Sequence, residues 1–307
     1  MVTIIRKELA DYFTSIRCFI LFLLVLLTSA GTLYAVQQGI REAATKTDFV
    51  FLGLFTTSGE AIPSLVIFII FLVPIIGIAL GFDAINSERS SGTLSRIISQ
   101  PVYRDSVING KFLAGIVTLS IMMAATLLLV SGYGLRMIGV APTAEEIIRL
   151  FIYLILIIIY GAFWMGLAML FSVLFRKIAT SLLSPIAIWL FFSFFILMIA
   201  PAIANILAPV ADGTQEAMIR NAELQQMIMR FSPTTLFSEA TMVLLLPQVR
   251  SLGLVTMSQA AFMIPNPLSL GQSLLLIWPQ ITSLVGLSAI CFAVSYVLFM
   301  RQEIRAT

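Results

Sequence analysis

A polar segment at residues 83–111 lies between two long hydrophobic stretches and carries four cations. The four are Arg89, Arg96, Arg104 and Lys111. Exposed charges can orient a protein partner, and the apolar residues Leu94, Ile97 and Ile98 could be buried against one. From the residues alone, two interpretations stay open. The segment is either a docking surface for another protein or a solvated loop whose cations only orient the chain in a membrane.

Side chains that commonly do covalent or metal chemistry are scarce in this chain. It has no histidine and two cysteines, and Cys18 and Cys291 lie in separate hydrophobic stretches without CxxC spacing. No imidazole is therefore present to bind a metal, relay a proton or activate a nucleophile. The sequence predicts no catalytic residue, no metal site and no cofactor bound by this chain.

A phosphate-binding P-loop is also missing from the sequence. Gly110 and Lys111 form the dipeptide found in such loops, but Asp105 stands where the first glycine belongs. Phe112 replaces the hydroxyl residue that would reach Mg²⁺. The chain is therefore expected to be non-catalytic and unable to hydrolyse ATP by itself.

The composition is that of a membrane protein. Hydrophobic residues make up 60% of the 307 positions and charged residues 11%, whereas soluble domains carry about 25% charged residues. The mean hydropathy is +1.05. A spanning helix needs about 20 mostly apolar residues, and six stretches qualify: 18–36, 64–82, 112–135, 150–175, 180–203 and 280–300. We predict an all-α integral membrane protein with a single transmembrane domain over residues 1–307.

Residues 1–17 precede the first predicted span and have helical periodicity. Their apolar residues recur at spacings of three and four, at Ile4, Ile5, Leu9, Tyr12, Phe13 and Ile16. This pattern predicts an amphipathic helix in the membrane interface. A cleaved signal peptide is the alternative, and Glu8 and Asp11 disfavour it because signal peptides begin with a cationic region.

The cations are distributed unevenly between the two sides that six alternating spans define. Eleven lie before the first span, within 83–111, between the fourth and fifth spans, or after the sixth. The other seven are spread over longer connections on the opposite side. Short loops rich in Lys and Arg are retained in the cytoplasm. Both termini and residues 83–111 are therefore predicted to be cytoplasmic.

The six apolar cores contain no Asp, Glu, Lys or Arg. Ion-coupled carriers place such a group near mid-membrane, so a secondary transporter is disfavoured. Pro74 and Pro185 are predicted to bend the second and fifth spans. Gly161 and Gly166, with neighbouring alanines, are predicted to let the fourth span pack closely against another helix.

Residues 204–279 form the largest predicted connection, between the fifth and sixth spans. Asp212 is placed to cap a helix that continues through Phe231. Ser232 and Pro233 fit the cap and first residue of a second helix. The connection is expected to be a small helical cap on the outer side. Its six methionines could bind Cu(I) as soft ligands, but their spacing favours simple packing of apolar helix faces.

Three short motifs occur in order along residues 60–135: Glu88-Arg89-x-x-Gly92-Thr93-Leu94, Pro101-Val102-x-Arg104 and Gly110-Lys111. In this order and between two spans, they resemble the cytoplasmic hallmark of type-2 ABC transporter permeases. The resemblance is to the NosY-like branch, whose members include membrane subunits associated with nitrous oxide reductase maturation. The rest of the chain resembles this family in architecture only.

The resemblance implies that the polar segment is a coupling helix that docks on a separate ATPase subunit. The residues assigned to this role are Glu88, Arg89, Gly92, Thr93, Leu94, Pro101, Arg104, Gly110 and Lys111. Gly92 and Thr93 would permit a tight break between two short helices. Glu88 and Arg89 would supply charges to the rim of the docking surface.

The resemblance also implies partners and a transport function. The expected partners are two ABC ATPase subunits, which carry ATP and Mg²⁺, and a second permease copy in a homodimer or related heterodimer. The chain would then be the permease subunit of an ATP-driven exporter in a prokaryotic cell membrane, with no role in nucleic-acid binding. The alternative is a mechanotransmitting subunit that acts on an extracytoplasmic protein, for example in metalloenzyme maturation, without moving a small molecule.

Overall fold

The computed structural model describes residues 1–43, 49, 51–58, 62–90, 92, 103–139, 141–210, 214–249 and 267–302. Within these ranges the regular secondary structure is helical, without a strand. Six helical stretches are long and apolar enough to cross a membrane: Ile16–Tyr34, Leu65–Ser90, Arg104–Met137, Ala144–Leu174, Ile178–Leu207 and Leu270–Arg301. The prediction of an all-α integral membrane protein with six spans is confirmed.

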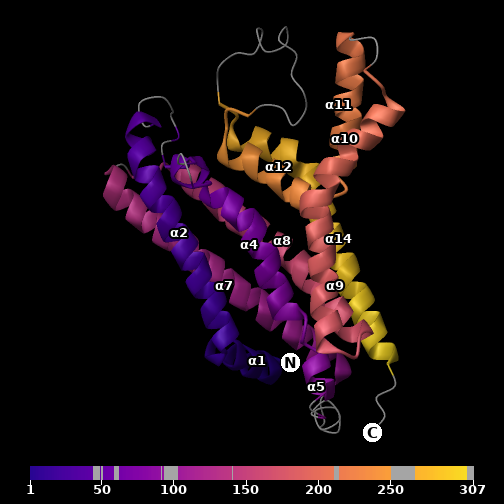
Figure 1. The fold of residues 1–307 in the computed structure, drawn as a ribbon. Coiled ribbons are helices and arrows are strands. Elements are labelled where there is room, and N and C mark those ends of the chain that lie inside the picture. The colour runs from indigo at the N-terminus through magenta and orange to yellow at the C-terminus, as the bar shows by residue number, and fades with distance from the viewer. Residues whose placement is uncertain are drawn as a thin grey trace. The chain divides into compact units, whose positions relative to one another are not determined.

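The helices follow one another along the chain as Figure 1 shows. They are α1 (Val2–Thr14), α2 (Ile16–Ala43), α3 (Gly53–Thr56), α4 (Leu65–Gly81), α5 (Asn86–Ser90), α7 (Arg104–Ile138), α8 (Ala144–Leu174), α9 (Ile178–Leu190), the π-helix η1 (Phe191–Phe195), α10 (Ile196–Leu207), α11 (Gln215–Met229), α12 (Pro233–Leu245) and α14 (Leu270–Arg301). The short helix α1 is confirmed as a helix, and its location in a membrane interface stays a prediction.

The last span is longer than the sequence predicts. The apolar stretch begins near residue 280, but α14 starts at Leu270 and continues through Pro279. Membrane helices tolerate an internal proline because neighbouring groups can satisfy the freed backbone carbonyl. Pro74 and Pro185 likewise lie within α4 and α9, and the bends predicted at them stay predictions.

The chain forms two compact units, residues 1–186 with 285–307 and residues 187–284. In the first unit α4 and α8 lie side by side (Figure 1) and approach each other through glycines. A Cβ atom on Gly77 would lie 2.7 Å from the carbonyl oxygen of Gly161, and one on Gly81 would lie 3.0 Å from the Cβ of Ala168. The close packing predicted for the fourth span is confirmed at Gly161. A Cβ on Gly166 would make only ordinary contacts, from 3.7 Å outwards.

The second unit contains the helices of the connection between the fifth and sixth spans. Ser232 caps α12 by accepting a hydrogen bond from the Thr235 backbone N–H at 3.4 Å, and Pro233 is the first helical residue. This pair is confirmed. Helix α11 is capped by Thr214, two positions after the Asp212 that the sequence suggested, which lies outside the described residues. Both Asp and Thr are good capping residues, so composition alone does not choose between them.

A single carboxylate connects three helices of this second unit. Glu239 on α12 accepts hydrogen bonds from Arg230 at 3.0 Å, from Gln226 at 3.1 Å and from Gln280 at 2.9 Å. The charge is therefore paired and hydrogen-bonded, as a nearly buried carboxylate must be. These contacts hold α11, α12 and the beginning of α14 together.

Candidate functional site

The polar segment begins at the end of α4, where a turn over residues 82–85 leads into α5. The side-chain oxygen of Ser172 accepts hydrogen bonds from the backbone N–H groups of Ile85 and Asn86, at 3.0 and 3.1 Å. Ser181 donates to the carbonyl oxygen of Phe82 at 2.6 Å. The start of the segment is thus fixed to the end of the fourth span and to the beginning of the fifth.

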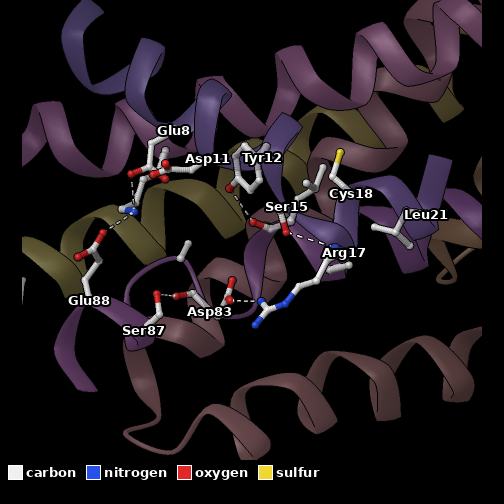
Figure 2. A pocket seen from close by; sticks show the side chains of 14 residues that line it. Glu8, Asp11, Tyr12, Ser15, Arg17, Cys18, Leu21, Asp83, Ser87 and Glu88 are labelled. Carbon is white, nitrogen blue, oxygen red and sulfur yellow. Dashed lines mark hydrogen bonds and ion pairs between the residues drawn. The ribbon is translucent and has the colours of Figure 1, made fainter. Parts of the chain in front are cut away.

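A cluster of four charges joins α1, α5 and α7. The Lys111 ammonium lies 2.8 Å from a carboxylate oxygen of Glu8 and 3.3 Å from one of Glu88. Lys7 lies 3.5 Å from Glu88 and 3.4 Å from Glu8. Figure 2 shows Glu8 and Glu88 converging from two helices. We call these four residues the ion cluster.

The members of the ion cluster differ in their exposure to solvent. The side chain of Lys111 is 5% exposed and that of Glu88 is 13% exposed, whereas Lys7 is 54% exposed. Partial burial acts to lower the pKa of Lys7, but the carboxylates of Glu8, Glu88 and Asp11 outweigh it and raise this pKa above its ordinary value. Glu8 is the buried residue of the amphipathic helix α1, whereas Ile4, Ile5 and Leu9 are half-buried. A carboxylate can be buried here because Lys111 faces it.

The resemblance assigns Glu88 to the rim of a docking surface and Lys111 to the same coupling segment. The structure directs both charges into the chain's own ion cluster, so an additional contact with an ATPase stays a prediction. Removing one member of a buried pair leaves an uncompensated charge. Substitutions at these two positions therefore report on intramolecular packing before they report on docking.

A second set of contacts fixes the corner between α1 and α2 onto the end of α4. Arg17 is ion-paired with Asp83 and lies over the ring of Phe82, 5.5 Å from its centroid. The Tyr12 hydroxyl donates to the carbonyl oxygen of Leu80 at 2.9 Å. Burial, together with nearby carboxylates, raises the pKa of Tyr12, so this hydroxyl stays protonated and able to donate.

A polar pocket of about 210 Å³ lies between these two sets of contacts. Figure 2 shows Asp83 and Ser87 on one wall and Glu8, Asp11 and Tyr12 on another. The charged side chains on its walls take part in ion pairs. Glu8, Glu88 and Lys111 pair within the ion cluster, Arg17 pairs with Asp83, and Asp11 pairs with Lys7. The pocket lies at the junction of α1, α4, α5 and α7.

Two glycines of the motifs have distinct structural roles. Gly92 adopts a left-handed conformation, with φ of +70°, and its N–H donates to the carbonyl oxygen of Arg89 at 3.2 Å. Glycine adopts this conformation without steric cost. The break between two short helices stays a prediction, because residues 93–102 lie outside the described residues. A Cβ on Gly110 would lie 2.8 Å from Ile4, so Gly110 permits α1 to approach α7.

Part of the predicted coupling segment lies outside the described residues. The residues concerned are Thr93, Leu94, Arg96 and Pro101. Their assignment to an ATPase contact stays a prediction.

Arg89 and Arg104 converge on the residue that follows α14. Arg89 donates from its guanidinium to the side-chain oxygen of Gln302. Arg104 donates to the backbone carbonyl of Gln302 at 3.2 Å. The Gln302 amide in turn donates to the carbonyl oxygen of Val173 at 2.7 Å. Two of the predicted site residues are thus brought together by a third that the sequence analysis did not identify.

A family model described as "ABC-2 family transporter protein" matches residues 2–304. The chain belongs to the ABC-2 transporter family. It is also similar to a protein from Pseudomonas aeruginosa named "Probable ABC transporter permease protein NosY", with 29% identity over 184 residues. That alignment covers 59% of this chain and 58% of the relative, so the match spans less than two thirds of the relative's length.

Sequence reasoning on this ABC-2 family chain missed Glu8 and Gln302 as site residues. Glu8 counted only as an argument against a signal peptide. Gln302 follows a long apolar helix as one neutral polar residue, and no motif marks it. A carboxylate on the buried face of an otherwise amphipathic helix was the available signal for Glu8, because buried charges require partners.

Proposed function

We propose that this chain is the permease subunit of an ATP-driven ABC exporter. Two separate ATPase subunits carry ATP and Mg²⁺ and hydrolyse the nucleotide, while this chain is non-catalytic. A second permease copy completes the membrane part, and the translocation route lies between the copies, lined by the second and fifth spans. The match of residues 2–304 to the ABC-2 family supports this proposal.

The observation that carries the proposal is the fixation of the polar segment to several membrane helices. Residues 86–89 contact α1 and α7 through the ion cluster, α8 through Ser172, and Gln302 at the end of α14. A loop that only linked two spans would need none of these connections. A segment that receives force from an ATPase needs connections of this kind to pass the force to the membrane helices.

The proposal includes an orientation in the membrane. Both termini and residues 83–111 face the cytoplasm, where an ATPase and its nucleotide are present. The positive-inside distribution of the cations supports this orientation. Figure 1 places the N-terminus and α5 at the same end of the first unit.

A second candidate is a subunit that uses ATP hydrolysis to act on an extracytoplasmic protein. The helices of the second unit expose large apolar side chains, among them Met218, Met227, Phe231 and Met242. Exposed apolar groups outside the spans favour contact with a protein or with the bilayer surface. Reconstitution that shows ATP-driven transport of a substrate would exclude this candidate.

Binding of a cognate ATPase tests the proposal. The full chain is co-expressed with a candidate ABC ATPase from the same organism, and ATP hydrolysis is measured for each subunit alone and for the complex. We expect co-purification, and hydrolysis only when the ATPase is present. Robust hydrolysis by the chain alone, or no co-purification, would contradict the proposal.

A matched pair of substitutions locates the contact. Leu94→Asp places a charge in the predicted apolar face of the coupling segment and should abolish co-purification. Leu246→Asp makes the same change at an exposed position after α12 and should leave the complex intact. Equal effects of the two substitutions would show that residues 93–104 are not part of the docking surface.

A further inference from the structure

Gln302 contacts three helices through three polar groups. Its side-chain oxygen accepts from Arg89 on α5, its amide donates to Val173 on α8, and its backbone carbonyl accepts from Arg104 at the start of α7. These partners are separated from Gln302 by 213, 129 and 198 positions in the sequence. They come together only in the folded chain.

We propose that Gln302 is a positioning residue that makes the coupling segment and the end of α14 move as one body. When an ATPase displaces residues 88–104, Arg89 carries Gln302, and with it the end of the sixth span. The hydrogen bond from the Gln302 side-chain amide to the Val173 carbonyl oxygen carries the end of α8 in the same motion. The functional part of this inference rests on the proposed function, whereas the mechanical link can be tested without an ATPase.

The chemistry at this position requires a side chain that donates and accepts at once. Val173 lies in the last turn of α8, where backbone carbonyls have no partner within the helix. The Gln302 amide satisfies this carbonyl, and its oxygen satisfies the Arg89 guanidinium. A carboxylate would keep the acceptor and lose the donor, whereas a lysine would lose the acceptor.

Among the described residues, α14 has few other contacts that could transmit a movement of the coupling segment to it. Only 17% of its most apolar window is buried. In the first unit Phe292 stacks on Phe112 of α7, with ring centroids 4.1 Å apart. This contact joins α14 to the third span but not to α5. Within the described residues, Gln302 therefore links the position of α5 to that of the end of α14.

A distance measurement tests the mechanical link. Spin labels are attached to cysteines introduced at Ser90 on α5 and Ile290 on α14, both exposed, after Cys18 and Cys291 are replaced by alanine. Electron paramagnetic resonance then gives the distribution of distances in the full chain in lipid nanodiscs. The chain with Gln302 intact should give one narrow peak. Gln302→Ala should broaden it, and an unchanged peak would overturn the proposal.

Combined substitutions separate the link from a general loss of structure. Arg89→Ala should also broaden the peak, and the double variant should be no broader than Gln302→Ala alone, because Gln302→Ala already removes the contact with Arg89. Arg104→Ala should add to the effect of Gln302→Ala, because Arg104 binds the backbone carbonyl that alanine retains. Additive effects of Arg89→Ala and Gln302→Ala would overturn the assigned pairing. Gln215→Ala, an exposed change on α11, is the matched control.

The ATPase complex tests the functional part. With Gln302 present, addition of ATP should leave the Ser90–Ile290 distance unchanged, because the two sites move together. With Gln302→Ala, the ATPase should still co-purify, but ATP should shift this distance. If the intact chain binds no ATPase, the proposed function fails, and the measurement on the isolated chain still decides the link. A distance that ATP shifts equally in both chains would overturn the inference.

Discussion

At the scale of single residues, Lys111 determines how the site is assembled. It pairs with Glu8 and Glu88 from two other helices while almost fully buried. Taking charges out of water is costly, and their attraction offsets that cost only while all partners are present. The ion cluster therefore contributes specificity to the arrangement of α1, α5 and α7 more than it contributes net stability.

Lys111→Met should destabilise the first unit by about 3 kcal/mol, because Glu8 and Glu88 lose their nearest cation. Lys7→Met removes an exposed member of the same cluster and should cost about 0–1 kcal/mol. Equilibrium unfolding in mixed detergent micelles measures both values. Similar losses for the two variants would contradict the assignment of Lys111 as the centre of the cluster.

Gly92→Val should impair the coupling segment, because a non-glycine residue in the left-handed region costs about 1–2 kcal/mol and a branched side chain is the least suited to it. Gly92→Asn should be milder, since asparagine tolerates this conformation. Co-purification of the ATPase should decrease in the order glycine, asparagine, valine. A valine variant that binds as well as glycine would show that the turn is dispensable for docking.

At the scale of helices, the packing of α4 against α8 depends on small residues. Gly77 and Gly81 are four positions apart on α4. A Cβ atom added at either glycine would lie within 3 Å of a backbone oxygen of α8. Small residues at this spacing let membrane helices come close enough for extensive van der Waals contact. The polar segment follows directly from α4, so this packing also fixes where the segment begins.

Gly77→Ala should destabilise the chain by about 1–3 kcal/mol, because the added methyl group meets a backbone oxygen that cannot turn away. Gly132→Ala on α7 is the control, since no atom lies within 4 Å of its Cβ position. It should be neutral or slightly stabilising, because alanine favours helices over glycine. Thermal unfolding in detergent compares the two, and an equal change would contradict the close α4–α8 contact.

At the scale of the whole molecule, the proposed orientation predicts that Ser90 faces the cytoplasm and that Gln215 faces the opposite side of the membrane. A single cysteine at Ser90 should be protected from an impermeant thiol reagent in intact cells, and one at Gln215 should react. Permeabilised cells should label both positions, which controls for burial. Reaction at Ser90 in intact cells would show that the topology is the reverse of the proposed one. The coupling segment would then lie on the side of the membrane opposite to a cytoplasmic ATPase.

The sequence by itself determined the helical membrane fold, the six spans and the Ser232–Pro233 helix start. These depend on hydropathy and capping within a short window of residues, so local composition suffices to predict them. The structure differs from the prediction in two details. Helix α14 is longer because a long helix can include a proline, and α11 is capped by Thr214 because several residue types can cap a helix.

Tertiary structure alone decided which charges meet. Lys111 and Glu8 are 103 positions apart, and Arg89 and Gln302 are 213 apart. No local pattern encodes such pairs, because they depend on which helix ends become neighbours after α4, α7, α8 and α14 have packed. Burial of a charge then selects the arrangement in which every partner is present. The motif residues were therefore recognisable in the sequence, but their partners were not.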